Sequence, residues 1–312
     1  MNTKVWVRWP LPLQWVGLVI GLGLLVGEAR AQPTLQVVTK VIEKEFPYSA
    51  GQRVRLAADK ADITIHGWSR PLVSVRLRLI AKHADRAVAE REVSYQQYTL
   101  ASTGNDIDLS NRFVVPRGAG QVQSQLKAVY EISIPTGALL TLKNAFGDVR
   151  ISSLTSDTNL TFEFGKLTLD EVGGKLTIKS SYGDIEGRDV KAVLAINAEK
   201  ADIVLRELTG STRIRSRYGK LTVLPASGLT TLVVEAARTD VLITPRRLAD
   251  FQYDVVTSFS EIRVPDALQN ELGKLGSKQT FTYQPPGHKP EIQVENSYGT
   301  VTIQTITSLV DR

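Results

Sequence analysis

FGDVRI at 146–151 is the first of five related hexapeptides whose starts lie 18 residues apart; the others are FGKLTL at 164–169, YGDIEG at 182–187, KADIVL at 200–205 and YGKLTV at 218–223. The pattern continues at steps of 20, 21 and 39 residues, with RTDVLI at 238–243, FSEIRV at 259–264 and YGTVTI at 298–303. We interpret KADITI at 60–65 and GNDIDL at 104–109 as outlying copies. A period of 18 kept over five copies is typical of a stacked repeat architecture.

Each repeat alternates apolar and polar residues with period 2, which indicates strands. Aligning the repeats gives columns of aliphatic residues, as an interior with identical neighbours above and below requires. One column is Val149, Leu167, Ile185, Ile203, Leu221 and Val241, and another is Leu142, Leu160, Ile178, Ile196, Ile214 and Val234. The sequence therefore predicts an all-β fold, a β-solenoid with rungs of about 18 residues and two or three short strands per turn.

A further column contains only small residues: Ser180, Ala198, Ser216 and Ala236. It predicts a tight interior with no room for a ligand. A left-handed hexapeptide helix also has 18 residues per turn, but it requires an aliphatic residue every six positions. The apolar spacing here does not fit that requirement.

The segment before residue 135 is less regular. Strands are expected around 54–56, 63–65 and 73–79, and the Ala-, Glu- and Arg-rich stretch 84–93 predicts a short helix. A second helix is expected at 266–275, interrupted by Gly273, and a loop at 284–290. We divide the chain into a signal peptide at 1–31, an irregular β portion at 32–135 and regular solenoid repeats at 136–312.

The N-terminus has the features of an export signal. Lys4 and Arg8 precede an apolar stretch from Leu11 to Gly27, and Ala29-Arg30-Ala31 provides an A-x-A cleavage site before Gln32. An uncleaved membrane anchor is the alternative, but the stretch is short for a membrane span. We expect no transmembrane span in the mature chain and a location in the periplasm, on the outer membrane surface or outside the cell.

Composition excludes several classes of function. The chain contains no Cys, so it has no disulfide, no cysteine-ligated metal and no thiol nucleophile. The formal net charge is +6, and removing the +2 carried by residues 1–31 leaves +4, which does not support nucleic-acid binding. His66, His83 and His288 lack metal-like spacing. No nucleotide-binding, GxSxG or HExxH motif is present.

The segment EISIPTG at 131–137, followed by strands that repeat an aromatic or small residue, Gly, Asp and an aliphatic residue, carries a family resemblance. It resembles the bacterial "putative adhesin" domains of unknown function, described as head domains of auto-transporter-like adhesins. The resemblance covers about residues 33–305 and implies an exported, right-handed, single-chain β-solenoid or β-roll, in a family without established catalytic residues. Lys200-Ala201 and Arg238-Thr239 depart from the aromatic–Gly pattern, so we expect those two turns to differ in shape.

A column of charged residues lies two positions after the aromatic residue of each repeat: Asp148, Lys166, Asp184, Asp202, Lys220, Asp240 and Glu261. Stacked rungs would bring Asp184 and Asp202 about 4.8 Å apart. Carboxyl groups about 5 Å apart can serve a retaining glycosidase or a cation site. The simpler interpretation is a solvated turn, with Lys166 and Lys220 neutralising the pair from both sides. The sequence leaves open whether this stack binds a cation.

Two further patterns have a structural and a functional interpretation. The aromatic column Phe146, Phe164, Tyr182, Tyr218, Phe259 and Tyr298 is either corner packing or a carbohydrate-stacking strip. Arg76 and Arg78 alternate with apolar residues, either as a solvated strand face or as a contact for anionic glycans or lipid headgroups.

These observations favour an exported, non-catalytic module of the bacterial cell envelope, either structural or adhesin-like in binding a glycan or a protein. The alternatives are a carbohydrate-active β-helix enzyme, a lyase or hydrolase, and a periplasmic regulatory or sensor partner. We assign no catalytic, cofactor-binding or metal-binding residues and expect no cofactor. The ligand-binding residues and the oligomeric state stay open.

Overall fold

The computed structural model describes residues 35–306, and the expected signal peptide at 1–31 lies outside this range. The elements are β1 (Gln36–Pro47), β2 (Arg53–Trp68), β3 (Leu72–His83), α1 (Arg86–Val93), β4 (Gln96–Thr103), β5 (Asp106–Phe113), β6 (Gln125–Pro135), β7 (Leu139–Phe146), β8 (Val149–Ser152), β9 (Thr158–Ser181), β10 (Gly183–Glu199), β11 (Ile203–Ile243), η1 (Leu248–Asp250), β12 (Gln252–Ser258), β13 (Ile262–Arg263), η2 (Asp266–Glu271), β14 (Leu272–Leu275), β15 (Lys278–Tyr283), β16 (Glu291–Ser297) and β17 (Val301–Ile303). The expected strands at 54–56, 63–65 and 73–79 and the loop at 284–290 are confirmed.

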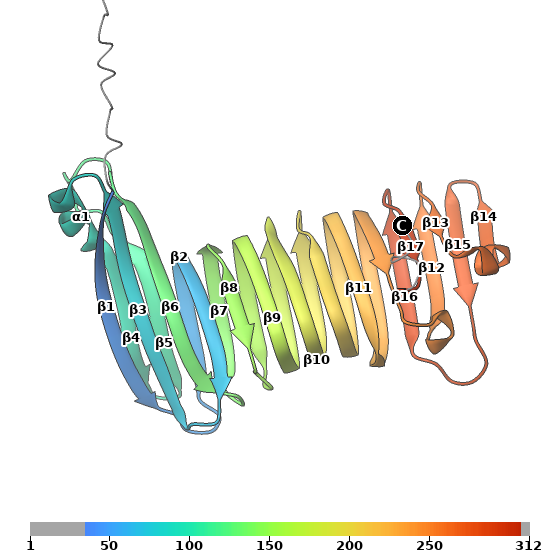
Figure 1. The fold of residues 1–312 in the computed structure, drawn as a ribbon, viewed down its shortest axis with the longest axis horizontal. Helices are drawn as coiled ribbons and strands as arrows, with labels where there is room; N and C mark the ends of the chain where they lie inside the picture. The colour runs from blue at the N-terminus through green and yellow to red at the C-terminus, as the bar shows by residue number, and fades with distance from the viewer. Residues whose placement is uncertain (1–34, 307–312) are drawn as a thin grey trace, which may run out of the picture. The chain divides into compact units, whose positions relative to one another are not determined.

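The 18-residue period is the pairing register of a β-solenoid. Gly183 pairs with Gly165, and Ile203 pairs with Ile185, in parallel ladders (Figure 1). Each rung has a first arm that ends at the aromatic position, a corner, and a second arm that begins two residues later. First arms such as 193–199 stack into one sheet face, and second arms such as 203–206 stack into another.

The aliphatic columns fill the space between the two faces. All members of the Ile203 column and of the Ile214 column are buried. The column of small residues is interrupted by Phe162, which pairs with Asn144 and is 2% exposed. Gly183 makes room for this ring, because a Cβ there would lie 2.3 Å from the Phe162 Cε2. The expected tight interior is thus filled by side chains.

The C-terminal rung does not occupy the end of the stack. β16 pairs in parallel with β11 on one side, Thr231 with Glu291, and with β12 on the other, Gln252 with Glu291. β17 lies likewise between β11 and β13. The copy at 298–303 is therefore inserted between the copies at 238–243 and 259–264, and β15 and β14 continue the sheet beyond β12 in antiparallel order.

A similar insertion occurs near the N-terminus. β2 lies between β5 and β7 through its first half and between β6 and β8 through its second half. Lys60 pairs with Phe146 and Ile63 with Val149, so KADITI at 60–65 is a copy in register. GNDIDL at 104–109 is not, because Ile107 pairs with Val54 in the first arm. Its interpretation as a copy of the same motif was wrong.

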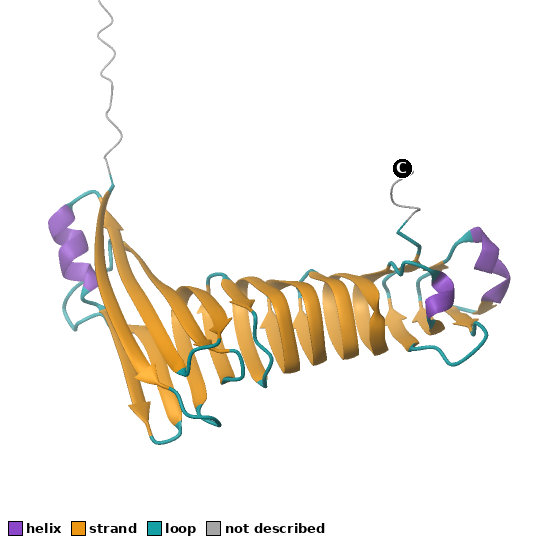
Figure 2. Cartoon of the chain, turned by 60° about the horizontal axis from the view of Figure 1, so that its bottom comes forward, coloured by secondary structure: helices purple, strands orange, loops and turns teal. Residues whose placement is uncertain are grey.

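The helical segments lie at the ends of the stack (Figure 2). The helix expected at 84–93 is confirmed as α1, whose N-cap Asp85 accepts a hydrogen bond from the Ala87 N–H at 2.8 Å. The second expected helix, at 266–275, is only partly present: a 3₁₀ helix ends at Glu271, and Leu272–Leu275 form β14 because they pair with β15. No helix in residues 35–306 is long and apolar enough to cross a membrane.

The two turns that lack aromatic–Gly have the ordinary corner shape, contrary to expectation. Lys200 and Arg238 adopt φ values of 53° and 52°, close to the 59° of Tyr218. From Tyr182 onward the left-handed conformation is therefore carried by the residue at the aromatic position itself, whereas at the two corners before it the positive φ lies at Gly147 and Gly165. At Gly219 a Cβ would lie 2.2 Å from the carbonyl oxygen of Ala201 in the adjacent rung, which accounts for that glycine.

Candidate binding site

The corner residues form one continuous stack, which we call the corner ladder: Lys60, Phe146, Phe164, Tyr182, Lys200, Tyr218, Arg238, Tyr298 and Phe259, in spatial order. Phe146 and Phe164 are parallel within 5°, with centroids 5.0 Å apart. Lys200 Nζ lies 4.7 Å from the Tyr182 ring centroid. The guanidinium of Arg238 lies between two rings, 5.4 Å from Tyr218 and 5.7 Å from Tyr298. The two cations thus replace rings as cation–π partners.

The ring orientation favours corner packing over a strip that stacks on sugars. Each ring turns at least one face toward a neighbouring ring or cation along the ladder. A sugar that stacks on an aromatic side chain needs a free ring face. The rings are still exposed, from 40% for Phe164 and Tyr218 to 62% for Phe259, so the corner ladder presents mainly ring edges and cationic groups to the solvent.

The acidic column has a defined structural role. Asp184 Oδ1 accepts a hydrogen bond from the Asp202 N–H at 2.9 Å, and Asp202 Oδ1 accepts one from the Lys220 N–H at 2.9 Å. Asp148 and Asp240 make the same contact with the next rung in the stack. Each carboxylate therefore satisfies a backbone N–H at a corner, where the chain leaves one arm and enters the next.

The lysines do not neutralise the acids as expected. Lys166 Nζ forms an ion pair with Glu186 at 2.5 Å, and Arg206 binds the same carboxylate at 2.7 Å. The hydrogen bond from Lys166, followed by that from Arg206, lowers the pKa of Glu186. Lys220 makes no ion pair within residues 35–306. The backbone N–H groups are the partners of Asp184 and Asp202 instead.

The other sequence candidates are also engaged in local contacts. Arg78 binds Glu131 at 2.6 Å, and Arg76 binds Glu43 at 3.2 Å, so both join neighbouring strands. His66 Nδ1 lies 3.0 Å from Ser152 Oγ, whereas His83 Nδ1 accepts from the Asp85 N–H. The three histidines are not brought together, and residues 35–306 contain no group of three His, Asp or Glu side chains arranged to hold a metal ion.

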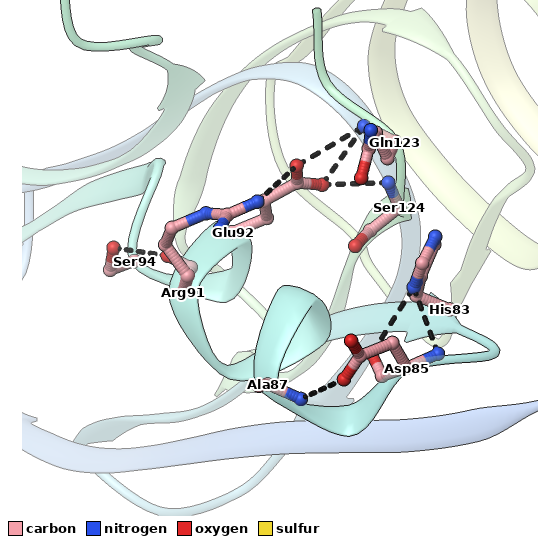
Figure 3. Close-up of polar contacts among 8 residues, drawn as sticks. All are labelled: His83, Asp85, Ala87, Arg91, Glu92, Ser94, Gln123 and Ser124. Carbon is pink, nitrogen blue, oxygen red and sulfur yellow. Dashed lines mark hydrogen bonds and ion pairs between the residues drawn. The ribbon is translucent and has the colours of Figure 1, made fainter. Parts of the chain in front are cut away.

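A buried carboxylate anchors α1 (Figure 3). Glu92 is 1% exposed and accepts hydrogen bonds from the Ser124 N–H at 2.6 Å and the Gln123 N–H at 3.1 Å; Arg91 lies 3.6 Å away. Burial alone would raise the pKa of Glu92, but the hydrogen bonds from Ser124 and Gln123 outweigh it and lower the pKa. This carboxylate fixes the segment before β6 and is a structural group.

A depression in the described surface lies on the first-arm face beside the corner ladder. Its volume is about 710 Å³, and its lining is predominantly polar. The lining residues are Asn197, Ala198, Glu199, Arg215, Ser216, Arg217, Glu235, Ala236, Ala237, Ser258, Glu295, Asn296 and Ser297. A second depression of about 480 Å³ adjoins it and shares Glu235 and Glu295.

Side-chain length explains why this face is hollowed. Ala237, Ser297 and Ser258 lie in one register row across three rungs, and their short side chains leave a floor. The longer side chains of Arg217 and Glu295 stand beside that floor. We call this feature the polar depression and define it by the thirteen lining residues above.

The polar depression contains both satisfied and unsatisfied polar groups. Arg215 Nε donates to Glu235 at 2.8 Å and Arg213 donates to the same carboxylate at 2.6 Å. The hydrogen bond from Arg215 lowers the pKa of Glu235. Glu199, Arg217 and Glu295 are exposed, and their side chains make no hydrogen bond or ion pair within residues 35–306.

The polar depression and the corner ladder are adjacent along the whole of this region. Glu199, Arg217, Ala237, Ser297 and Ser258 all line the depression. Each directly precedes a ladder residue in the sequence: Lys200, Tyr218, Arg238, Tyr298 and Phe259. The ladder therefore borders the depression on one side. Sequence reasoning found the ladder but missed the depression, although the change from long to short residues before the corner is visible in the sequence.

A comparison with protein families agrees with the solenoid architecture. A family model described as "Toastrack DUF4097" matches residues 52–304. No curated protein matches the chain. A solved structure of a "putative adhesin" from Bacteroides fragilis NCTC 9343 is 16% identical, with 86% of this chain and 97% of that chain covered and a TM-score of 0.47. A "putative lipid binding protein" from Parabacteroides distasonis ATCC 8503 is 12% identical, with 84% and 96% covered and a TM-score of 0.43.

Proposed function

Since the chain belongs to the Toastrack DUF4097 family, we propose that it is an exported, non-catalytic β-solenoid that serves as an adhesin-like binding module of the bacterial cell envelope. The observation that carries this proposal is the contrast between a filled interior and the open polar depression. The interior columns leave no space for a ligand, whereas Glu199, Arg217 and Glu295 have unused hydrogen-bonding groups on the outer face.

The carboxylates support a binding role over a catalytic one. Glycoside hydrolysis requires one acid that protonates the leaving group and a second carboxylate that attacks or activates water. Asp184 and Asp202 instead accept backbone hydrogen bonds at the corners, where they bridge neighbouring rungs. We therefore place the carbohydrate-active enzyme second, and a periplasmic regulatory or sensor partner remains the other alternative.

Export rests on the sequence of residues 1–31. We propose that Ala31 is the last residue removed and that the mature protein begins at Gln32, in the periplasm, on the cell surface or outside the cell. N-terminal mass analysis of the exported protein tests this, with allowance for a cyclised Gln32. An intact Met1 would favour an anchor. Protease treatment of intact cells distinguishes a surface location from a periplasmic one.

Binding itself is tested with the purified full chain on intact bacterial cells and on isolated envelope fractions. Saturable retention that competes with unlabelled protein is the expected result. The matched control is the same chain denatured in urea and added under identical conditions. Absence of saturable binding to every fraction would overturn the binding role.

A further inference from the structure

We propose that the polar depression binds a neutral, hydroxyl-rich glycan chain. This inference rests on the proposed function, because it names the ligand class of the same binding module. In the depression, unpartnered donors and acceptors lie side by side. It also adjoins the exposed part of the corner ladder.

The unused groups match the hydrogen-bonding properties of hydroxyls. Arg217 offers only donors, whereas Glu199 and Glu295 offer only acceptors. Glu199 and Arg217 are register partners on adjacent parallel strands, so an acceptor and a donor stand next to each other. A hydroxyl donates one hydrogen bond and accepts others, so neighbouring hydroxyls of one sugar can satisfy both side chains.

The charge distribution of the polar depression disfavours a polyanionic ligand. Glu235 is already compensated by Arg213 and Arg215, and Glu295 is its register partner in the next rung. Glu199 and Glu295 leave two carboxylates without an ion-pair partner, against the single free guanidinium of Arg217. A polysaccharide rich in carboxylate or phosphate would meet like charges here, which disfavours its binding.

The dimensions favour a chain of several sugar units over a single sugar. The polar depression crosses rungs from Asn197 to Ser258, and the adjoining depression continues it through Glu235 and Glu295. The ladder side supplies the edges of Tyr218 and Tyr298 with the cation of Arg238 between them. These edges offer the sugar only van der Waals contact, while its hydroxyls face Arg217 and Glu295.

The first test fills the floor. Ala237→Gln places a longer side chain in the polar depression, and Ala145→Gln is the matched control because Ala145 precedes the corner residue Phe146 in the same way. The probes are an array of neutral oligosaccharides, polygalacturonate, and vesicles of phosphatidylglycerol. We expect neutral oligosaccharides to bind the unaltered chain and Ala145→Gln, and Ala237→Gln to lose at least tenfold in affinity.

The second test removes the polar partners without changing the floor. Arg217→Gln should weaken glycan binding about tenfold or more, as loss of a hydrogen bond to a charged group implies. Glu199→Gln should also weaken glycan binding. Glu163→Gln should not, because Glu163 occupies the same position two rungs before Glu199, outside the polar depression. Thermal melting checks that each variant is folded.

Three results would overturn the inference: no binding to any neutral oligosaccharide, binding only to polygalacturonate or to anionic vesicles, or equal binding by Ala237→Gln and Ala145→Gln. The experiment with cells and envelope fractions separates this failure from a failure of the proposed function. If the chain is retained on envelopes but binds no glycan, the glycan ligand is refuted and the proposed binding function is not. Loss of both would refute both.

Discussion

Asp184 and Asp202 carry the same charge in adjacent rungs, yet they are joined by a hydrogen bond, from the Asp202 N–H to Asp184 Oδ1 at 2.9 Å. The Asp202 N–H is the hydrogen-bond donor that faces the Asp184 carboxylate. The same contact recurs at Asp148, Asp202 and Asp240, so the acidic column is a repeated corner device.

We predict that Asp184→Asn and Asp202→Asn are mild, because the amide oxygen still accepts the backbone hydrogen bond. The expected loss is within about 1 kcal/mol. Asp202→Ala should cost more, about 1–3 kcal/mol, since it leaves the Lys220 N–H without its acceptor. Urea denaturation measures the difference. A calcium-dependent rise in melting temperature that Asp184→Asn abolishes would instead identify a cation site.

We predict that Ile203→Asp unfolds this part of the array. Ile203 is 0% exposed and lies between Ile185 and Leu221 in its column, so an unpaired carboxylate there costs several kcal/mol. Val204→Asp is the matched control, because the adjacent residue points to the opposite face of the same strand. Equal melting temperatures for the two variants would contradict the assignment of the buried column.

Glu92 gives a prediction about pH. The pKa of Glu92 is lowered in the folded protein, so its ionised form stabilises the fold above the ordinary pKa of a glutamate. That contribution is lost as the pH falls through the lowered pKa. Glu92→Gln should therefore destabilise the protein at pH 7, by about 1–3 kcal/mol, and the difference should shrink in acid. Denaturation of both proteins between pH 7 and pH 3 measures this, and hydrogen exchange at Gln123 and Ser124 reports it locally. A difference that is constant with pH would contradict the role of the charge.

The corner ladder gives a fourth prediction. Arg238→Ala removes a cation that lies near both Tyr218 and Tyr298, and we expect a loss of about 0.5–2 kcal/mol. Arg238→Lys should retain part of it. A double-mutant cycle with Tyr218→Leu isolates the Arg238–Tyr218 contact, and a coupling energy of zero would show that the two residues act independently.

The repeat made the fold predictable, because an 18-residue period with strand-type alternation leaves few other architectures. The columns through Ile203 and Ile214 followed directly from it. The order of the rungs did not follow, because a parallel strand with the same apolar pattern fits equally well on either side of 231–243. Segments 252–258 and 291–297 have the same alternation of apolar and polar residues, so the sequence does not show which of them pairs with 231–237. The large side chain of Phe162 fits in the column of small residues only because Gly183 has no Cβ. This contact between two rungs could not be predicted from the sequence.

The aligned repeats predicted the residues of the corner ladder, but not the orientation of their rings. Side-chain type alone does not say whether Tyr218 turns its face to solvent or to a neighbour. The left-handed backbone of Lys200 and Arg238 was likewise unexpected, because glycine is the usual residue in that conformation. The polar depression depends on the register of Ala237, Ser297 and Ser258, and that register exists only because the C-terminal rung is inserted.

That insertion has a consequence for biogenesis. During translation or export the segment 252–263 emerges before 291–303, although 291–303 must lie beneath it. Segment 252–263 has the same apolar–polar alternation as 291–303, so it can pair with the open strand edge at 231–243 first. That pairing would have to break before 291–303 can insert between the two. We expect the slowest phase of folding to be this exchange, and the carboxy-terminal portion to stay sensitive to protease until residue 303 is available. The native stack in this region can therefore form only after residues 291–303 have been synthesised and inserted.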